Sequence, residues 1–101
     1  MFDKLLQVQQ QAEELKKRLD AITVIGEAEG GMIKVTSTGN KQIREIHIDE
    51  NLIRNGDKEE LEELLVVAVN KAIEQAESIH QAEMQSLSQN MLGGLGNLFG
   101  G

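Results

Sequence analysis

The segment from Val24 to Asp49 constrains the fold most, because apolar and polar residues alternate along it and glycines interrupt it twice. Alternation with a period of two is typical of β-strands that have one buried face. The dipeptides Gly30-Gly31 and Gly39-Asn40 have the composition of two-residue hairpin turns. We therefore predict three antiparallel strands within residues 22–48.

Two-residue turns also fix which residues of neighbouring strands lie opposite one another. In the first hairpin Glu27 is predicted opposite Lys34, and in the second Lys34 opposite Glu45. One face of the sheet then carries a core set: Val24, Ala28, Ile33, Val35, Ile46 and Ile48. The other face combines the charged row with three apolar residues: Ile25, Met32 and Ile43. One helix cannot cover both faces, so the mixed face indicates a second subunit.

Helices are predicted before and after the sheet. In residues 2–21 apolar side chains recur at alternating spacings of three and four: Leu5, Val8, Ala12, Leu15, Leu19 and, just beyond, Ile22. This stripe fits packing on the chain's own sheet or against a second copy. Residues 49–56 are predicted to form a loop, and Asp57 to cap a helix that runs to about residue 89.

These elements define an α+β subunit with the order α-β-β-β-α and a single domain over residues 1–90. The last helix would be roughly 45–50 Å long, so its polar stretch after Ile79 is predicted to project beyond the sheet or to pair with another projecting helix. Residues 91–101 contain five glycines, a composition that disfavours a helix. We predict a flexible tail there.

Groups suited to catalysis are scarce in the sequence. The chain has no cysteine, which excludes disulfides and thiolate metal sites. His47 and His80 are not spaced as a metal-binding pair. His80 shares a helical stripe with Glu77 and Glu83, a pattern more typical of solvated polar residues than of a metal site. We therefore expect no enzymatic activity, no metal and no cofactor.

Charge is unevenly distributed along the chain. The net charge is −7, of which residues 57–101 carry −6 and residues 1–20 carry zero. An acidic chain is not expected to bind nucleic acid well, because such binding depends on Lys and Arg. An acidic surface suits a basic protein partner instead.

No apolar run approaches the ~20 residues that span a bilayer, and the N-terminus lacks the pattern of a signal peptide. We expect a cytoplasmic protein with no membrane partner.

Basic residues gather at two places, the end of the first helix and the sheet with its turns: Lys16, Lys17, Arg18, Lys34, Lys41 and Arg44. The helical group has an alternative structural role, because Glu13–Lys17 and Glu14–Arg18 are spaced for salt bridges one helical turn apart. The sequence alone leaves both interpretations open.

A resemblance to the YbaB/EbfC family of bacterial nucleoid-associated proteins is carried by the run IGEAEGGMIKVTSTGNKQIREIHID and the following DKEELEELLVVAVNKAIEQA. It covers nearly the whole chain. The matching positions are Gly26, Gly30, Gly31, Lys34, Asp49 and Asn70. The chain departs from the pattern at Glu50, where the family often has proline, and at Lys71, where it often has aspartate.

The resemblance implies a homodimer with the sheets at its centre and long helices projecting from it. It also implies DNA binding, nucleoid organisation and effects on gene expression. We therefore expect the chain to bind double-stranded DNA with low sequence specificity in the cytoplasm, at the nucleoid. The six basic residues named above are the candidate phosphate contacts. The alternative is an acidic module that binds a basic protein through the sheet face, the projecting helices or the tail.

Overall fold

The structure is a computed structural model that describes the backbone of residues 2–99 and the side chains of residues 3–89. Its elements are, in order, α1 (Phe2–Ala21), β1 (Thr23–Ala28), the 3₁₀ turn η1 (Glu29–Gly31), β2 (Ile33–Thr38), β3 (Ile43–Ile48), α2 (Glu50–Asn55) and α3 (Lys58–Phe99). The three strands form one antiparallel sheet in the order β1-β2-β3. The α+β class and the long C-terminal helix are confirmed.

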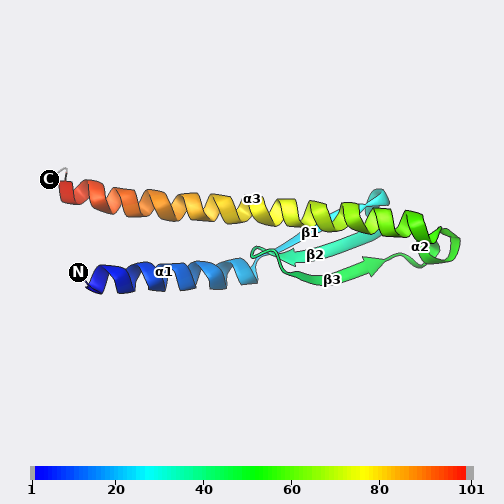
Figure 1. Ribbon diagram of the computed structural model, residues 1–101, viewed down its shortest axis with the longest axis horizontal. Helices are drawn as coiled ribbons and strands as arrows, with labels where there is room; N and C mark the ends of the chain where they lie inside the picture. The colour runs from blue at the N-terminus through cyan, green and yellow to red at the C-terminus, as the bar shows by residue number, and fades with distance from the viewer. Residues whose placement is uncertain (1, 100–101) are drawn as a thin grey trace.

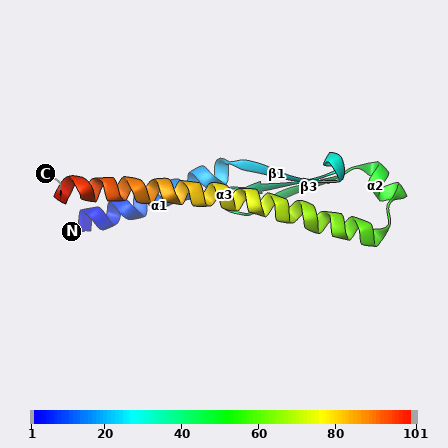
Figure 2. The same ribbon diagram turned by 90° about the horizontal axis from the view of Figure 1, so that it is seen from above.

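The molecule is elongated, with the sheet towards one end (Figure 1). The first half of α3 lies along the sheet, and its second half continues beyond the sheet. There α1 runs beside α3 in the opposite direction, so that both chain ends lie at the same end of the molecule (Figures 1 and 2). This arrangement confirms that the last helix projects beyond the sheet. Over residues 2–99, no helix is both long and apolar enough to cross a membrane.

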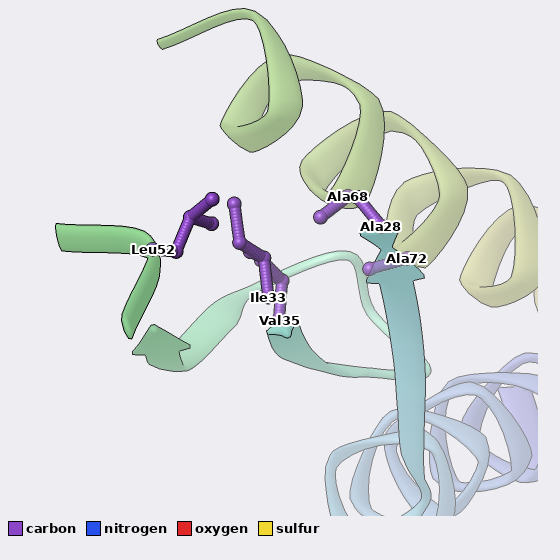
Figure 3. Close-up of a cluster of buried hydrophobic side chains, with 6 residues drawn as sticks. All are labelled: Ala28, Ile33, Val35, Leu52, Ala68 and Ala72. Atoms are coloured by element: carbon purple, nitrogen blue, oxygen red, sulfur yellow. The ribbon is translucent and has the colours of Figure 1, made fainter. Parts of the chain in front are cut away.

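Close packing of α3 on β1 and β2 makes the core. Three alanines one turn apart on α3, Ala68, Ala72 and Ala76, are fully buried. They allow the helix backbone to approach β1 so closely that a Cβ at Gly26 would lie 2.2 Å from the carbonyl oxygen of Ala68. The apolar cluster that includes two of these alanines consists of Ala28, Ile33, Val35, Leu52, Ala68 and Ala72 (Figure 3).

The first hairpin has the predicted turn and register. Gly30 and Gly31 have positive φ angles of 65° and 93°, a backbone region that glycine adopts without a steric penalty. The Met32 amide donates to the Glu29 carbonyl across this turn, at 3.2 Å. Glu27 lies opposite Lys34, which confirms the predicted pairing.

The second hairpin differs from the prediction by two positions. Lys34 lies opposite His47, and Glu45 opposite Thr36. The turn contains three residues instead of two, because Lys41 adopts a positive φ of 65° and the hairpin closes only where the Thr38 amide donates to the Gln42 carbonyl, at 2.9 Å. A register shift next to Thr36 adds a bulge. The charged row across the sheet therefore ends at His47.

The third strand is less buried than predicted. Val35 is fully buried, but its partner Ile46 is 50% exposed, and Ile48 is half-buried. The reason is the placement of α3, which packs on β1 and β2 and leaves β3 uncovered. Ile43 at the start of β3 is also exposed.

The β2–β3 turn holds the C-terminal end of α1. The Gly39 amide donates to the carbonyls of Leu19 (2.8 Å) and Ile22 (3.1 Å). The Asn40 side chain donates to the Lys16 carbonyl (3.0 Å) and to the Asp20 carboxylate (2.5 Å). The bond to Leu19 gives a partner to one of the carbonyls that the end of a helix leaves without one, and the others fasten the turn to α1.

The apolar stripe of α1 is only partly used within the subunit. Leu15 and Leu19 are buried against the rest of the chain, whereas Leu5 and Val8, nearer the N-terminus, are exposed. Packing on the chain's own sheet thus accounts for the end of α1 next to the sheet. The projecting end keeps its apolar residues available to a partner.

Residues 49–56, predicted as a loop, contain the short helix α2. The Asp49 side chain caps it by accepting from the Asn51 amide at 2.8 Å, and Leu52 is buried in the core.

Asp57 precedes α3 as predicted, and its carbonyl accepts from the Leu61 amide at 2.9 Å. The α3 backbone continues past the predicted end to Phe99, since extending an existing helix adds one hydrogen bond per residue. The domain boundary at residue 90 and the flexibility of the tail stay predictions, and Gly100 and Gly101 lie outside the described residues.

Candidate nucleic-acid interface

Five of the six predicted basic residues gather where α1 meets the sheet. Lys16, Lys17 and Arg18 lie in the last turns of α1 and are exposed. Lys41 lies in the β2–β3 turn, which is bonded to α1 through Asn40, and Arg44 lies in the adjoining start of β3. We call Lys16, Lys17, Arg18, Lys41 and Arg44 the junction cluster.

Lys34 lies apart from the junction cluster. It is four residues before the end of β2, about 13 Å along the strand from the turn. Its neighbours across the sheet are Glu27 and His47, and its side chain is exposed. The structure therefore separates one of the six predicted contacts from the other five.

Two members of the junction cluster form ion pairs with α3. Arg18 Nη2 lies 3.4 Å from Glu83 Oε2, and the Lys41 ammonium donates to the Glu77 carboxylate. The pairs predicted within α1, Glu13–Lys17 and Glu14–Arg18, are not formed in the described part of the chain. Arg18 finds its carboxylate on α3 instead.

Lys16 and Lys17 have no carboxylate partner within 4.0 Å among residues 3–89. Both side chains are exposed at the end of α1. A lysine ammonium in this setting is free to contact a phosphate, which is how such residues contribute most to nucleic-acid affinity.

The carboxylate of Glu77 is bonded at both oxygens. One accepts from Lys41, and the other from the Gln81 amide at 3.2 Å. The hydrogen bond and the charge of Lys41 lower the pKa of the Glu77 carboxyl below its ordinary value, and Gln81 and His80 act in the same direction. Glu77 is therefore fully ionised at neutral pH and holds Lys41 by charge as well as by hydrogen bonding.

Glu77 and Glu83 were not predicted from the sequence as partners of the basic residues. With His80 they formed only a weak metal-binding pattern. Over residues 3–89 no group of three His, Asp or Glu side chains is arranged to hold a metal ion. The spacing of the two glutamates along α3 was the available signal, but pairing them with their basic partners required knowing that α1 runs beside α3.

The surface between α1 and α3 is open and mixed in character. A pocket of about 420 Å³ is lined by Gln11, Glu14, Lys17, Arg18 and Leu87. Its lining joins the junction cluster to the projecting part of the two helices. The basic side chains therefore border the groove between α1 and α3.

The fold and this site define a class of α+β proteins in which two helices extend past a small antiparallel sheet and basic residues lie where they leave it. Residues 1–91 match the model of the YbaB/EbfC DNA-binding family. The chain belongs to this family.

Relatives with curated names support this assignment. The chain is 38% identical to a "nucleoid-associated protein" of Flavobacterium johnsoniae, over 98% of this chain and 94% of the relative. It is 35% identical to a "nucleoid-associated protein" of Chlorobium phaeobacteroides, over 93% of this chain and 83% of the relative. The crystal structure of an uncharacterized protein from Helicobacter pylori has the same fold, with a TM-score of 0.69 and 23% identity over 90% of this chain and 92% of that one.

Proposed function

We propose that this protein binds double-stranded DNA as a homodimer, with low sequence specificity, and contributes to nucleoid organisation and gene regulation in the cytoplasm. Membership of a DNA-binding family supports DNA as the ligand. The observation that carries the proposal is the junction cluster, which concentrates five basic side chains on a chain of net charge −7. On a surface this acidic, such a cluster is the region best suited to approach phosphates.

Low specificity follows from the kind of contact that the junction cluster offers. Three of its five members are lysines, which bind phosphates as point charges. Contacts to phosphates position a protein on the duplex, whereas reading the sequence requires side chains aimed at base edges. The chain has no Trp or Tyr and two Phe, so stacking on bases has little to contribute.

The homodimer is supported by the apolar surface that one subunit leaves uncovered. Ile46 on the α3 side of β3 is 50% exposed, and Ile25 in β1 is 45% exposed. A second copy of the chain would bury such residues and bring two junction clusters into one assembly. Doubling the clusters raises the number of phosphates that one molecule can contact, which is how an acidic protein would reach useful affinity.

The test is to replace Lys16, Lys17 and Arg18 together by alanine and to measure binding to random-sequence duplex by fluorescence anisotropy at several salt concentrations. Binding should weaken about equally for all sequences. The slope of log K against log salt should fall by about 0.9 for each phosphate that the variant no longer neutralises. The matched control replaces Arg54, Lys58 and Lys71, which removes the same charge outside the cluster.

The control should bind nearly as tightly as the unmodified protein. Equal weakening by both triple variants would reduce the effect to net charge and contradict the assignment of the site. No binding by the unmodified protein at low salt would contradict DNA binding itself. Circular dichroism of each variant verifies that the fold is retained.

A second candidate function is a module that binds a basic protein partner. The observation that favours it is the outer surface at the start of α3, where Val66 and Val67 are exposed and Glu62 and Glu63 precede them. An apolar pair beside carboxylates suits a basic, partly apolar peptide. Capture of a partner from nuclease-treated lysate, lost when Val66 is changed to Ser, would favour this candidate over DNA binding.

A further inference from the structure

Four ion pairs are present among the described residues, and they fall into two kinds. Arg54–Glu50 in α2 and Lys58–Glu62 in α3 each join two residues one turn apart in the same helix. The other two join different elements, and each uses a member of the junction cluster: Arg18 with Glu83 and Lys41 with Glu77. The carboxylates of α3 thus reach two basic residues proposed to bind DNA.

We propose that Glu77 and Glu83 act as internal competitors of DNA, occupying Lys41 and Arg18 in the free protein until phosphates displace them. This inference rests on the proposed DNA binding. It assigns to the two glutamates a regulatory role at the same site, since they set how much of the junction cluster is available to the duplex.

The exposure of these ion pairs makes displacement feasible. The Arg18 side chain is 65% exposed and its partner Glu83 34%, while Lys41 and Glu77 are 39% and 41% exposed. Water competes with ion pairs at such positions, and their net contribution to stability is small. Partners of this kind exchange readily, whereas a buried pair would hold the basic residues permanently.

Phosphates have two advantages over the two carboxylates. A duplex carries one negative charge per about 1.7 Å of its axis, and each neutralised phosphate releases bound counterions. An arginine can also bind a phosphate with two parallel hydrogen bonds. In the free protein the closest approach of Arg18 to Glu83 is 3.4 Å, longer than the usual spacing of a charge-assisted hydrogen bond.

The exchange also affects how α1 is held. Within residues 3–89, Arg18–Glu83 is the one ion pair that links α1 to α3. When a phosphate takes Arg18, this link is broken, while the bonds of Gly39 and Asn40 still attach the end of α1 to the sheet. DNA binding would therefore loosen the pair of projecting helices without detaching the cluster from the sheet.

The test uses Glu77→Gln, Glu83→Gln and the double variant, which keep the side-chain size and remove the charge. Each single variant should bind random-sequence duplex about two- to fivefold more tightly, as expected for removal of an exposed ion-pair partner. The matched controls are Glu59→Gln and Glu63→Gln in the first turns of α3. Glu63 lies about 21 Å along the helix from Glu77, well beyond the screening length of about 8 Å at physiological salt, so these controls should leave affinity nearly unchanged.

A double-mutant cycle separates competition at Lys41 from a general effect of charge. In a Lys41→Ala background the Glu77→Gln change should no longer tighten binding, because the residue it releases is absent. The same tightening in both backgrounds would overturn the proposal.

The outcomes also distinguish this inference from the function on which it rests. If the unmodified protein binds DNA and the Gln variants bind no more tightly than the controls, DNA binding stands and the competition is wrong. If neither the unmodified protein nor the double variant binds at low salt, both the proposed DNA binding and the proposed competition are wrong.

Discussion

At the scale of single residues, the junction cluster is defined as much by its acidic neighbours as by its basic members. Lys16 and Lys17 are free of carboxylates among residues 3–89, whereas Lys41 and Arg18 are held by α3. The five positive charges are therefore not equivalent. Lys16, Lys17 and Arg44 have no carboxylate partner among residues 3–89, whereas Lys41 and Arg18 would have to give up theirs to bind a ligand.

The ionisation of Glu77 offers a direct measurement of one of these contacts. Its pKa in the folded protein is lowered from the ordinary value of 4.5, first by the hydrogen bond from Lys41 and then by the charge of Lys41. A lowered pKa means that the contact stabilises the fold above the ordinary pKa, and that this stabilisation disappears as the pH falls through the folded-state pKa. Titration of the side-chain carboxyl by NMR should show Glu77 deprotonating below pH 4.5.

The matched variant for this titration is Lys41→Ala. It removes the two largest causes of the shift and leaves Gln81 and His80 in place. The pKa of Glu77 should then rise towards the ordinary value. A titration curve that is the same in both proteins would show that Lys41 does not contact Glu77 in solution.

At the scale of elements, the contact between β1 and α3 determines the fold. The stripe of alanines on α3 and Gly26 on β1 bring a helix backbone and a strand backbone into direct contact. Side chains of ordinary size would hold the two elements further apart. The same contact places α3 over β1 and β2, and this position leaves β3 uncovered.

Replacing Gly26 by alanine should therefore be strongly destabilising. The added Cβ would lie 2.2 Å from the Ala68 carbonyl oxygen and 2.4 Å from the Ala72 nitrogen, both backbone atoms. Overpacking of this kind, against atoms that cannot rotate away, lowers the free energy of unfolding by about 3 kcal/mol or more. Urea denaturation followed by circular dichroism measures the decrease.

Gly30→Ala is the control for the Gly26 variant. A Cβ there meets nothing within 4 Å, and the only cost is the left-handed φ of 65°, about 1–2 kcal/mol. Equal destabilisation by the two variants would mean that α3 does not approach β1 as closely as the structure shows.

The two hairpins show what could be predicted from the sequence. Gly30-Gly31 specifies a two-residue turn by its backbone preference alone, so the first register was predicted correctly. Gly39-Asn40 has a similar composition, but its groups bind the end of α1, and the turn takes in Lys41 and closes one residue later, at Gln42. The second register depended on a tertiary contact, which local composition does not contain.

At the candidate site, too, local features could be predicted from the sequence and tertiary contacts could not. The basic residues were identified from the sequence, and the attachment of the β2–β3 turn to α1 brings five of them together. Their acidic partners were not identified, because Arg18 and Glu83 are 65 positions apart in the chain. The carboxylates predicted for Lys17 and Arg18 lie one turn away in the same helix, whereas Arg18 pairs with a carboxylate of α3 and Lys17 with none among residues 3–89.

At the scale of the whole molecule, one subunit is extended and incompletely covered. It measures 67 × 21 × 16 Å, with a radius of gyration of 19.4 Å, against about 13 Å for a compact chain of this length. Leu5 and Leu6 on α1 and Ile46 on β3 are at least half exposed. A chain of this size buries only a small hydrophobic core, so apolar residues left exposed cost it stability. In addition, β3 is an edge strand with unpaired backbone groups. Both features support a second copy as the covering partner.

The oligomeric state tests this proposal through Ile46→Glu. If β3 lies in a dimer interface, the new carboxylate would be buried without a partner and the dimer should dissociate. Light scattering after size exclusion should give about twice 11.1 kDa for the unmodified protein and the subunit mass for the variant.

The control is Ile53→Glu on α2, where the isoleucine is 57% exposed, comparable to the 50% of Ile46. Because neither isoleucine is buried within the subunit, both variants should fold, and only the first should dissociate. A monomeric unmodified protein, or equal dissociation of both variants, would contradict an interface at β3, and the junction cluster would then have to bind DNA from a single subunit.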